Sequence, residues 1–160
     1  MQNLDKVIAY LKQVEEWGHF EVFLVLCVSR SMSFEQLEAH QKRVLDYTNS
    51  ERKNIFLSSC LISAILDATF KQLRSDNWKK VGNVLELFEP ILYTENNFLL
   101  LTEILFLRFQ ESLYQIRMGD EKARLDILDI FNMVSHFHFS PKVYPNWFEQ
   151  YGKIINLSEG

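Results

Sequence analysis

The stretch QVEEWGHFEVFLVL, from Gln13 to Leu26, decides the fold, because a charged run passes through Trp17 and Gly18 straight into an apolar run. If one helix continued through it, Gly18 would lie in the helix interior at a cost of roughly 1 kcal/mol relative to alanine. Two helices that meet at a corner avoid this cost. We therefore interpret Trp17-Gly18 as the tight corner of a helical hairpin, in which glycine lets the backbones approach and Trp17 covers the apolar ends.

Composition indicates one globular domain. The chain has 160 residues, of which 48% are hydrophobic, with only five Gly and three Pro, so it can bury one sizeable core. The formal net charge of -4 gives no long-range attraction to phosphate backbones, which disfavours direct nucleic-acid binding by this chain.

The cysteines and the apolar runs bear on location. Cys27 and Cys60 lie inside apolar runs and are expected to be free, buried thiols. The sequence shows neither a secretory signature nor an uncharged apolar stretch of membrane-spanning length. We expect a cytoplasmic protein that does not associate with a membrane.

Apolar residues recur at helical spacing almost throughout, and no alternating strand pattern is found. The run VFLVLCV is apolar on every side, so its helix should be enclosed by neighbours. The expected helices run from Leu4 to Val14, His19 to Arg30, Ser33 to Tyr47, Ser50 to Leu73, the RSDN turn to Phe88 before Pro90, Thr94 to Arg117, Gly119-Asp120 to Phe137, and onward from Ser140-Pro141.

An internal repeat favours a stack of helical hairpins over a bundle. A shift of 43 residues lays Ile55–Phe88 over Phe98–Phe131 with apolar positions in phase, and Arg74 then meets Arg117. Each unit is a long helix, a tight turn and a shorter helix. We predict an all-α, right-handed stack of about four hairpins, similar to a tetratricopeptide superhelix, with corners at Trp17-Gly18, Ser75-Asn77 and Gly119-Asp120.

The corner stretch is also similar to a known family. YLKQVEEWGHFEVFLVL, from Tyr10 to Leu26, resembles the signature YLxxVEEWGxxExxL of the C-terminal domain of the Rgg/GadR/MutR transcriptional regulators of Gram-positive cocci. The matching positions are Tyr10, Leu11, Val14, Glu15, Glu16, Trp17, Gly18 and Glu21. The resemblance implies a tetratricopeptide-like array that dimerises and commonly receives a short signalling peptide, as in quorum sensing.

In that family the array follows a helix-turn-helix DNA-binding domain, and no such segment precedes Asn3 in this sequence. We therefore expect residues 1–160 to form a single regulatory and dimerisation domain. DNA would be contacted only through a separate N-terminal domain that is absent from this chain. The homodimer expectation is strengthened by the apolar C-terminal stretch VYPNWFEQYGKII, which includes Tyr144, Trp147, Phe148 and Tyr151.

Catalytic constellations are not found in the sequence. Glu15 and Glu16 are adjacent, and neighbouring helix positions diverge by about 100°, so they cannot converge on one substrate. No phosphate-binding glycine loop, nucleophile elbow or zinc-ligand quartet occurs. We expect no enzymatic activity, no metal site and no cofactor.

Two polar stripes on the long helices are the candidate ligand site. The first contains Arg52, Ser59, Ser63 and Asp67, with Asn54 alongside, and the second contains Arg108, Glu111 and Gln115. An extended peptide needs partners for its backbone groups, and an arginine can hold a terminal carboxylate. If Arg108 is instead locked to Glu111, that pair is structural. The simpler alternative is that both stripes are solvated faces.

We thus interpret the chain as a peptide-responsive regulatory domain whose concave face binds a short, largely apolar signalling peptide. An alternative is a helical-repeat scaffold or dimerisation module that binds a protein partner and no small ligand. A weaker alternative is an enzyme whose site is dispersed over several helices.

Overall fold

The structure is a computed structural model that describes residues 2–51, 53–92 and 101–136. Within these ranges every regular element is helical, which confirms the all-α prediction. The elements are α1 (Gln2–Gln13), α2 (His19–Val28), η1 (Ser29–Ser31), α3 (Phe34–Glu38), α4 (Gln41–Asn49), α5 (Ile55–Leu73), η2 (Trp78–Lys80), α6 (Val81–Leu92), α7 (Leu101–Arg117) and α8 (Ala123–His136).

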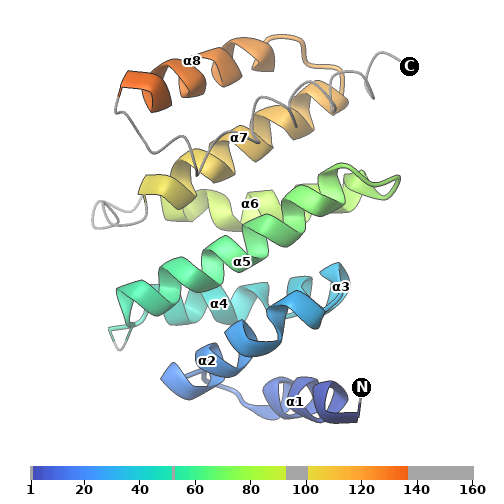
Figure 1. The fold of residues 1–160 in the computed structure, drawn as a ribbon, viewed down its shortest axis with the longest axis vertical. Coiled ribbons are helices and arrows are strands. Elements are labelled where there is room, and N and C mark those ends of the chain that lie inside the picture. The colour runs from blue at the N-terminus through green and yellow to red at the C-terminus, as the bar shows by residue number, and fades with distance from the viewer. Residues whose placement is uncertain (1, 52, 93–100, 137–160) are drawn as a thin grey trace.

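The helices form a stack, with α1 and α2 at one end and α7 and α8 at the other (Figure 1). In this view α2, α5 and α7 lie on the near side of the stack, while α4 and α6 lie behind them. Helix α5 contacts α2, α3, α4, α6 and α7, so it is the central element. The predicted stack of helical hairpins is confirmed.

The first corner lies where the sequence predicts it, between α1 and α2, but the reason for Gly18 differs. Trp17 is buried in the core, and its indole N–H points to the carbonyl oxygen of Leu11 at 3.5 Å. Gly18 has φ of -100°, and an added Cβ would meet only the Glu21 carboxyl group at ordinary contact distance. Close backbone approach is therefore not what selects glycine here. Gly18 is the N-cap of α2, a position at which glycine is favoured.

The corner after α7 does require glycine. Gly119 has φ of 97°, a conformation that side chains rarely adopt. Its N–H donates to the carbonyl of Ile116 at 2.9 Å, and the N–H of Asp120 donates to that of Gln115 at 3.0 Å. These two bonds form a Schellman motif, which satisfies the last carbonyls of α7 and turns the chain into α8.

The internal repeat corresponds to two structural units, α5 to α6 and α7 to α8. Positions separated by 43 residues are buried in both units, as in the pairs Ile62/Leu105, Leu66/Phe109, Leu73/Ile116, Val84/Ile127 and Phe88/Phe131. The apolar phase read from the sequence therefore marks the faces that pack between helices.

Three side chains of α7, spaced seven residues apart, reach across to α5: Glu103, Gln110 and Arg117. Glu103 accepts hydrogen bonds from two serines of α5, Gln110 donates to the carbonyl of Leu66 at 3.0 Å, and Arg117 donates to the carbonyl of Leu73. We call these three residues the polar seam. They fix the position of α7 along α5.

Several predicted helix boundaries are wrong. The segment from Ser33 to Tyr47 is two helices, because the chain turns between α3 and α4 at His40, although the capping box of Ser33 and Gln36 is present. Helix α5 is capped by Asn54 and not by Ser50, which instead ends α4. Helix α6 passes through Pro90 to Leu92. Proline there removes one hydrogen bond to Glu86, whose position is exposed to water. The predicted cap at Thr94 and the helix after Ser140-Pro141 lie outside the described residues.

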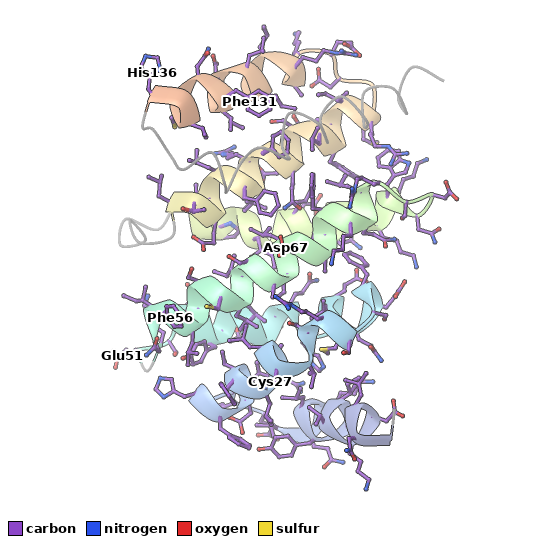
Figure 2. All side chains as sticks on the ribbon, viewed as in Figure 1. Cys27, Glu51, Phe56, Asp67, Phe131 and His136 are labelled. Atoms are coloured by element: carbon purple, nitrogen blue, oxygen red, sulfur yellow. The ribbon has the colours of Figure 1, made fainter. Side chains whose placement is uncertain are left out.

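Helix α2 is not enclosed as expected. Phe20 and Phe23 of α2 are exposed, with 61% and 56% of their surface accessible. Cys27 is exposed on the same helix (Figure 2), and Cys60 is partly buried, which corrects the expectation that both thiols are buried. Both cysteines are free.

Helix α5 is the one helix of the described ranges that is long and apolar enough to cross a membrane by length and composition alone. It has helices packed on several sides. Core helices of this kind pass the same test of length and composition.

His40 is buried at the break between α3 and α4, with 1% of its surface exposed. Its ring lies against Trp17 at 5.4 Å between centroids, and neither ring nitrogen has a hydrogen-bond partner among the described residues. Burial lowers the pKa of His40, and the nearby charges of Arg43 and Lys12 lower it further. The neutral ring is the form that the fold accommodates.

We expect acid to destabilise the fold through His40. Because the folded pKa lies below the unfolded value of 6.5, stability is full above that value and is lost as pH falls, by up to about 1.4 kcal/mol per pH unit. His40→Phe keeps the ring packed and removes this slope. Urea unfolding from about pH 7.5 to about pH 5.5 measures the difference. Equal slopes in the two proteins would show that His40 is not the cause.

Candidate functional site

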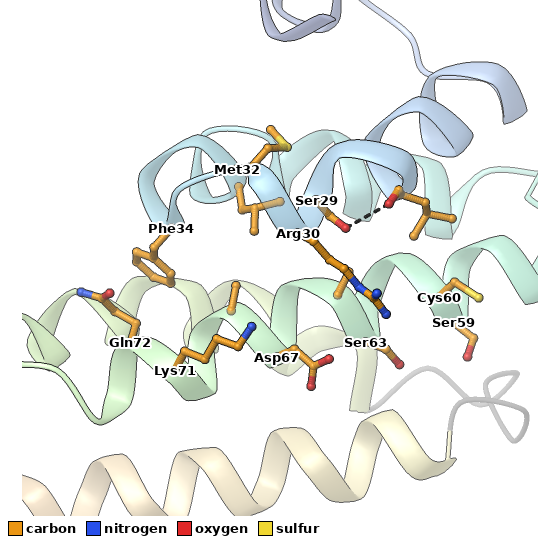
Figure 3. Close-up of a pocket in the computed structure, with 14 residues that line it drawn as sticks. Ser29, Arg30, Met32, Phe34, Ser59, Cys60, Ser63, Asp67, Lys71 and Gln72 are labelled. Atoms are coloured by element: carbon orange, nitrogen blue, oxygen red, sulfur yellow. Dashed lines mark hydrogen bonds between the residues drawn. The ribbon is translucent and has the colours of Figure 1, made fainter. Parts of the chain in front are cut away.

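A cavity of about 750 Å³ lies between α5 and the segment formed by α2, η1 and α3 (Figure 3). We call it the α2–α5 groove. Its apolar lining is Leu26, Met32, Phe34, Leu37, Cys60, Ala64 and Ala68. Its polar lining is Ser29, Arg30, Ser59, Ser63, Asp67, Lys71 and Gln72. The small side chains of α5 at this surface leave the space open.

The first predicted stripe lines this groove. Ser59 and Ser63 donate hydrogen bonds to Oε1 of Glu103, at 2.5 Å and 3.1 Å. Glu103 is itself buried on α7. The two hydroxyl hydrogens are therefore used inside the protein, while the oxygens keep lone pairs that can accept hydrogen bonds from a ligand.

The charges of the groove are unequal. Arg30 reaches from η1 toward α5, where Asp67 and Ser63 lie below it (Figure 3). Burial raises the pKa of Asp67, while the positive charges of Lys71 and Arg30 lower it. Among the groove's lining residues, two cations thus face one acidic group.

The second predicted stripe lines a different and smaller cavity, of about 320 Å³, between α7 and α8. Arg108 Nη1 lies 3.6 Å from Glu111 Oε2, and Gln115 is next to them on the same wall. Burial raises the pKa of Glu111 to about 7, with Arg108 opposing the rise and Glu89 adding to it. Arg108 and Glu111 are therefore paired with each other, which is the structural alternative given in the sequence analysis.

Asn54 has a local role in the fold. Its side-chain oxygen accepts the N–H of Leu57 at 3.1 Å, and its backbone N–H donates to the Tyr47 hydroxyl at 3.0 Å. Arg52 lies outside the described residues. The predicted residues whose positions are described therefore form two separate clusters and a helix cap, and only Ser59, Ser63 and Asp67 share the larger groove.

Sequence reasoning missed Arg30, Lys71 and Phe34 of the groove. Lys71 follows Ser63 and Asp67 at spacings of four, so the stripe could have been extended by one turn. No local sequence pattern identifies Arg30 and Phe34 as groove residues, because their position in the groove depends on which segment packs against α5.

The signature residues of the sequence surround a third cavity, of about 700 Å³, which is lined by Glu15, Glu16, Trp17, Gly18, Arg43, Asp46, Tyr47, Ser50 and Glu51. Arg43 donates to the carbonyls of Leu11 and Lys12, at 2.8 Å and 2.9 Å. It thereby caps the end of α1 from α4. The described ranges bring no three His, Cys, Asp or Glu side chains together in a metal-binding arrangement.

Comparison with known proteins gives a match in fold. No protein-family model and no curated protein sequence matches the chain. A crystal structure of the SHP pheromone receptor Rgg2 of Streptococcus dysgalactiae superposes with a TM-score of 0.74 at 19% identity, covering 96% of this chain and 57% of that one. A cysteine-to-serine variant of the same receptor gives a TM-score of 0.76 at 20% identity, covering 95% and 54%. The chain thus spans little more than half of the receptor's length and shares its helical fold, as the resemblance of Tyr10 to Leu26 implied.

We expect Glu103→Ala to destabilise the protein by about 1 to 3 kcal/mol, since it leaves Ser59 and Ser63 without their partner and opens space between α5 and α7. Urea unfolding followed by circular dichroism measures the change. Glu86→Ala is the matched control, because Glu86 is exposed on α6, and it should stay within about 0.5 kcal/mol of the parent protein. A Glu103 variant as stable as this control would rule out a structural role for the carboxyl group.

Proposed function

We propose that the chain is the peptide-sensing regulatory domain of a transcription regulator of the Rgg type, and that it binds a short signalling peptide in the α2–α5 groove. The observation that carries the proposal is a groove of about 750 Å³ with apolar walls and few polar groups, in a stack of the Rgg2 fold. Ligand sites generally combine these features.

The groove offers suitable partners for an extended peptide. Each backbone N–H or C=O group that entered an apolar groove without a partner would cost about 1 to 3 kcal/mol. The oxygens of Ser59, Ser63 and Asp67 can accept peptide N–H groups, and Gln72 adds an amide. Leu26, Met32 and Phe34 supply the apolar wall for the peptide's side chains.

In the proposed regulator, DNA is bound by a separate domain. The net charge of -4 is unfavourable for phosphate binding by this chain. Occupation of the groove would alter the spacing of α2 and α5, and the stack would pass this change to its neighbours because each repeat contacts the next.

Peptide binding can be tested by filling the groove. Ala64 lines it, so Ala64→Trp should weaken the binding of short peptides built from Leu, Ile, Val and Phe at least tenfold, about 1.4 kcal/mol. Ala9→Trp is the matched control, because Ala9 is exposed on α1 outside the groove, and it should bind as the parent does. Fluorescence anisotropy with labelled peptides gives the affinities.

Thermal unfolding of each variant verifies that the fold is kept. If the parent protein binds none of these peptides at millimolar concentration, the proposal fails and the scaffold alternative stands. If peptides bind equally to both tryptophan variants, the site lies elsewhere on the stack.

We further propose a homodimer in which α8 takes part. Leu125 and Leu128 are 65% and 50% exposed on α8. Their counterparts one repeat earlier, Gly82 and Leu85, are covered: a Cβ on Gly82 would lie 2.6 Å from the Tyr114 hydroxyl of α7, and Leu85 is buried. An outward apolar face at the end of a stack needs a cap or a partner.

Sedimentation equilibrium at micromolar concentration tests the dimer. We expect about twice the chain mass of 19.0 kDa for the parent protein and a shift toward the single-chain mass for Leu128→Glu, which places a charge in the interface. Met118→Glu is the control, because Met118 is exposed beyond the end of α7, and it should leave the mass unchanged. A parent mass near that of one chain would refute the dimer.

A further inference from the structure

The α2–α5 groove continues at one end into an exposed aromatic surface. Phe56 is 74% exposed and precedes the lining residues Cys60, Ser63 and Asp67 at spacings of four, three and four, so it lies on the same face of α5. Phe23 is 56% exposed and lies one helical turn before Leu26, which lines the groove from α2.

The two phenylalanines lie at the same end of the groove. Helices α2 and α5 run in the same direction in the stack (Figure 1). In the sequence, each phenylalanine precedes the lining residues of its helix. Phe23 and Phe56 are not lining residues of the groove but precede them on the two helices, and their exposure to water is unfavourable. An apolar ligand group placed between them would relieve this exposure.

Toward its other end the groove is cationic, since Arg30 lies over Ser63 and Asp67 (Figure 3) and Lys71 lies one turn beyond Asp67 on α5. Arg30 and Lys71 make no ion pair or side-chain hydrogen bond within the described part of the chain. Asp67 is the one acidic side chain among the groove's lining residues. A local excess of positive charge in a chain of net charge -4 favours an anionic group at this end.

We propose, building on the peptide-binding function proposed above, that the ligand is an amphipathic peptide whose carboxylate lies between Arg30 and Lys71 and whose aromatic or branched side chain lies between Phe23 and Phe56. Arg30 can hold a carboxylate through two parallel N–H bonds, and Lys71 adds a second cation. The groove thereby selects both the charge of the ligand and its direction along α5.

The length of the ligand follows from helix geometry. Phe56 and Asp67 are eleven residues apart, which corresponds to about 16 Å along the helix axis. An extended chain advances about 3.3 Å per residue, so about five residues join the two ends of the groove. The carboxylate can be the peptide's C-terminus or an acidic side chain near it, and both present the same oxygens to Arg30.

Three synthetic peptides distinguish these sources of the carboxylate. The first is N-acetyl-Trp-Leu-Ile-Val-Leu-Gly with a free C-terminus, the second is the same peptide with a C-terminal amide, and the third is N-acetyl-Trp-Leu-Ile-Val-Asp-Gly amide. By isothermal titration, we expect the free acid to bind at least tenfold more tightly than the apolar amide. Recovery of affinity in the third peptide would show that an acidic side chain serves equally well.

Protein variants locate the carboxylate. Arg30→Gln and Lys71→Gln should each reduce the advantage of the free acid over the amide, and the double variant should abolish it. Lys42→Gln is the control, because Lys42 is exposed on α4 away from the groove, and it should leave the advantage unchanged. Unchanged thermal transitions exclude misfolding.

The aromatic end has its own test. Phe56→Ser should weaken all three peptides about equally, and replacing the acetylated Trp of the peptide by Ser should remove this sensitivity. Met118→Ser is the control for loss of an exposed apolar side chain, because Met118 lies outside the groove. If the free acid and the amide bind with equal affinity, the inferred polarity is wrong while peptide binding stands. If none of the three peptides binds at millimolar concentration, both this inference and peptide binding in the groove are overturned.

Discussion

The polar seam between α5 and α7 is the interaction on which the rest of the stack depends. An interface made only of Leu, Ile and Phe side chains would hold two helices together and still allow them to slide by a turn, because many apolar packings have similar energies. Glu103, Gln110 and Arg117 remove that freedom, since each must meet its own partner on α5. Buried polar contacts are best known for this kind of role in register.

The seam also shapes the candidate site. Ser59 and Ser63 donate to the seam residue Glu103 and also line the α2–α5 groove. The hydroxyl groups that face a ligand are therefore held in place by a carboxyl group on α7. Side chains held in this way are positioned before a ligand arrives, which reduces the entropy lost on binding. Ala64 and Ala68 complete the arrangement, because larger residues there would close the space between α2 and α5.

Most of the fold could be predicted from the sequence, because helical spacing and corner residues such as Gly119 are local signals. The break at His40 was not predicted from the sequence, because the capping box at Ser33 marks where a helix begins and not where it ends. Less of the candidate site could be predicted, because helical spacing places residues on one face of a helix and does not say which neighbour that face meets. Arg108 therefore lines a different cavity from the one expected. Glu103 lies 44 and 40 residues from Ser59 and Ser63, and no local sequence pattern indicates that contact.

The stacked arrangement also bears on how the chain folds. Helices in the stack contact those nearby in sequence, so the polypeptide need not close long loops before it gains stabilising contacts, and folding of such topologies is fast. Opening should begin at the outer helices, each covered on fewer sides than α5. Amide hydrogens would then exchange with solvent slowest in the middle of the stack and progressively faster toward α1, so that the order of exchange along the chain reports the order in which repeats separate.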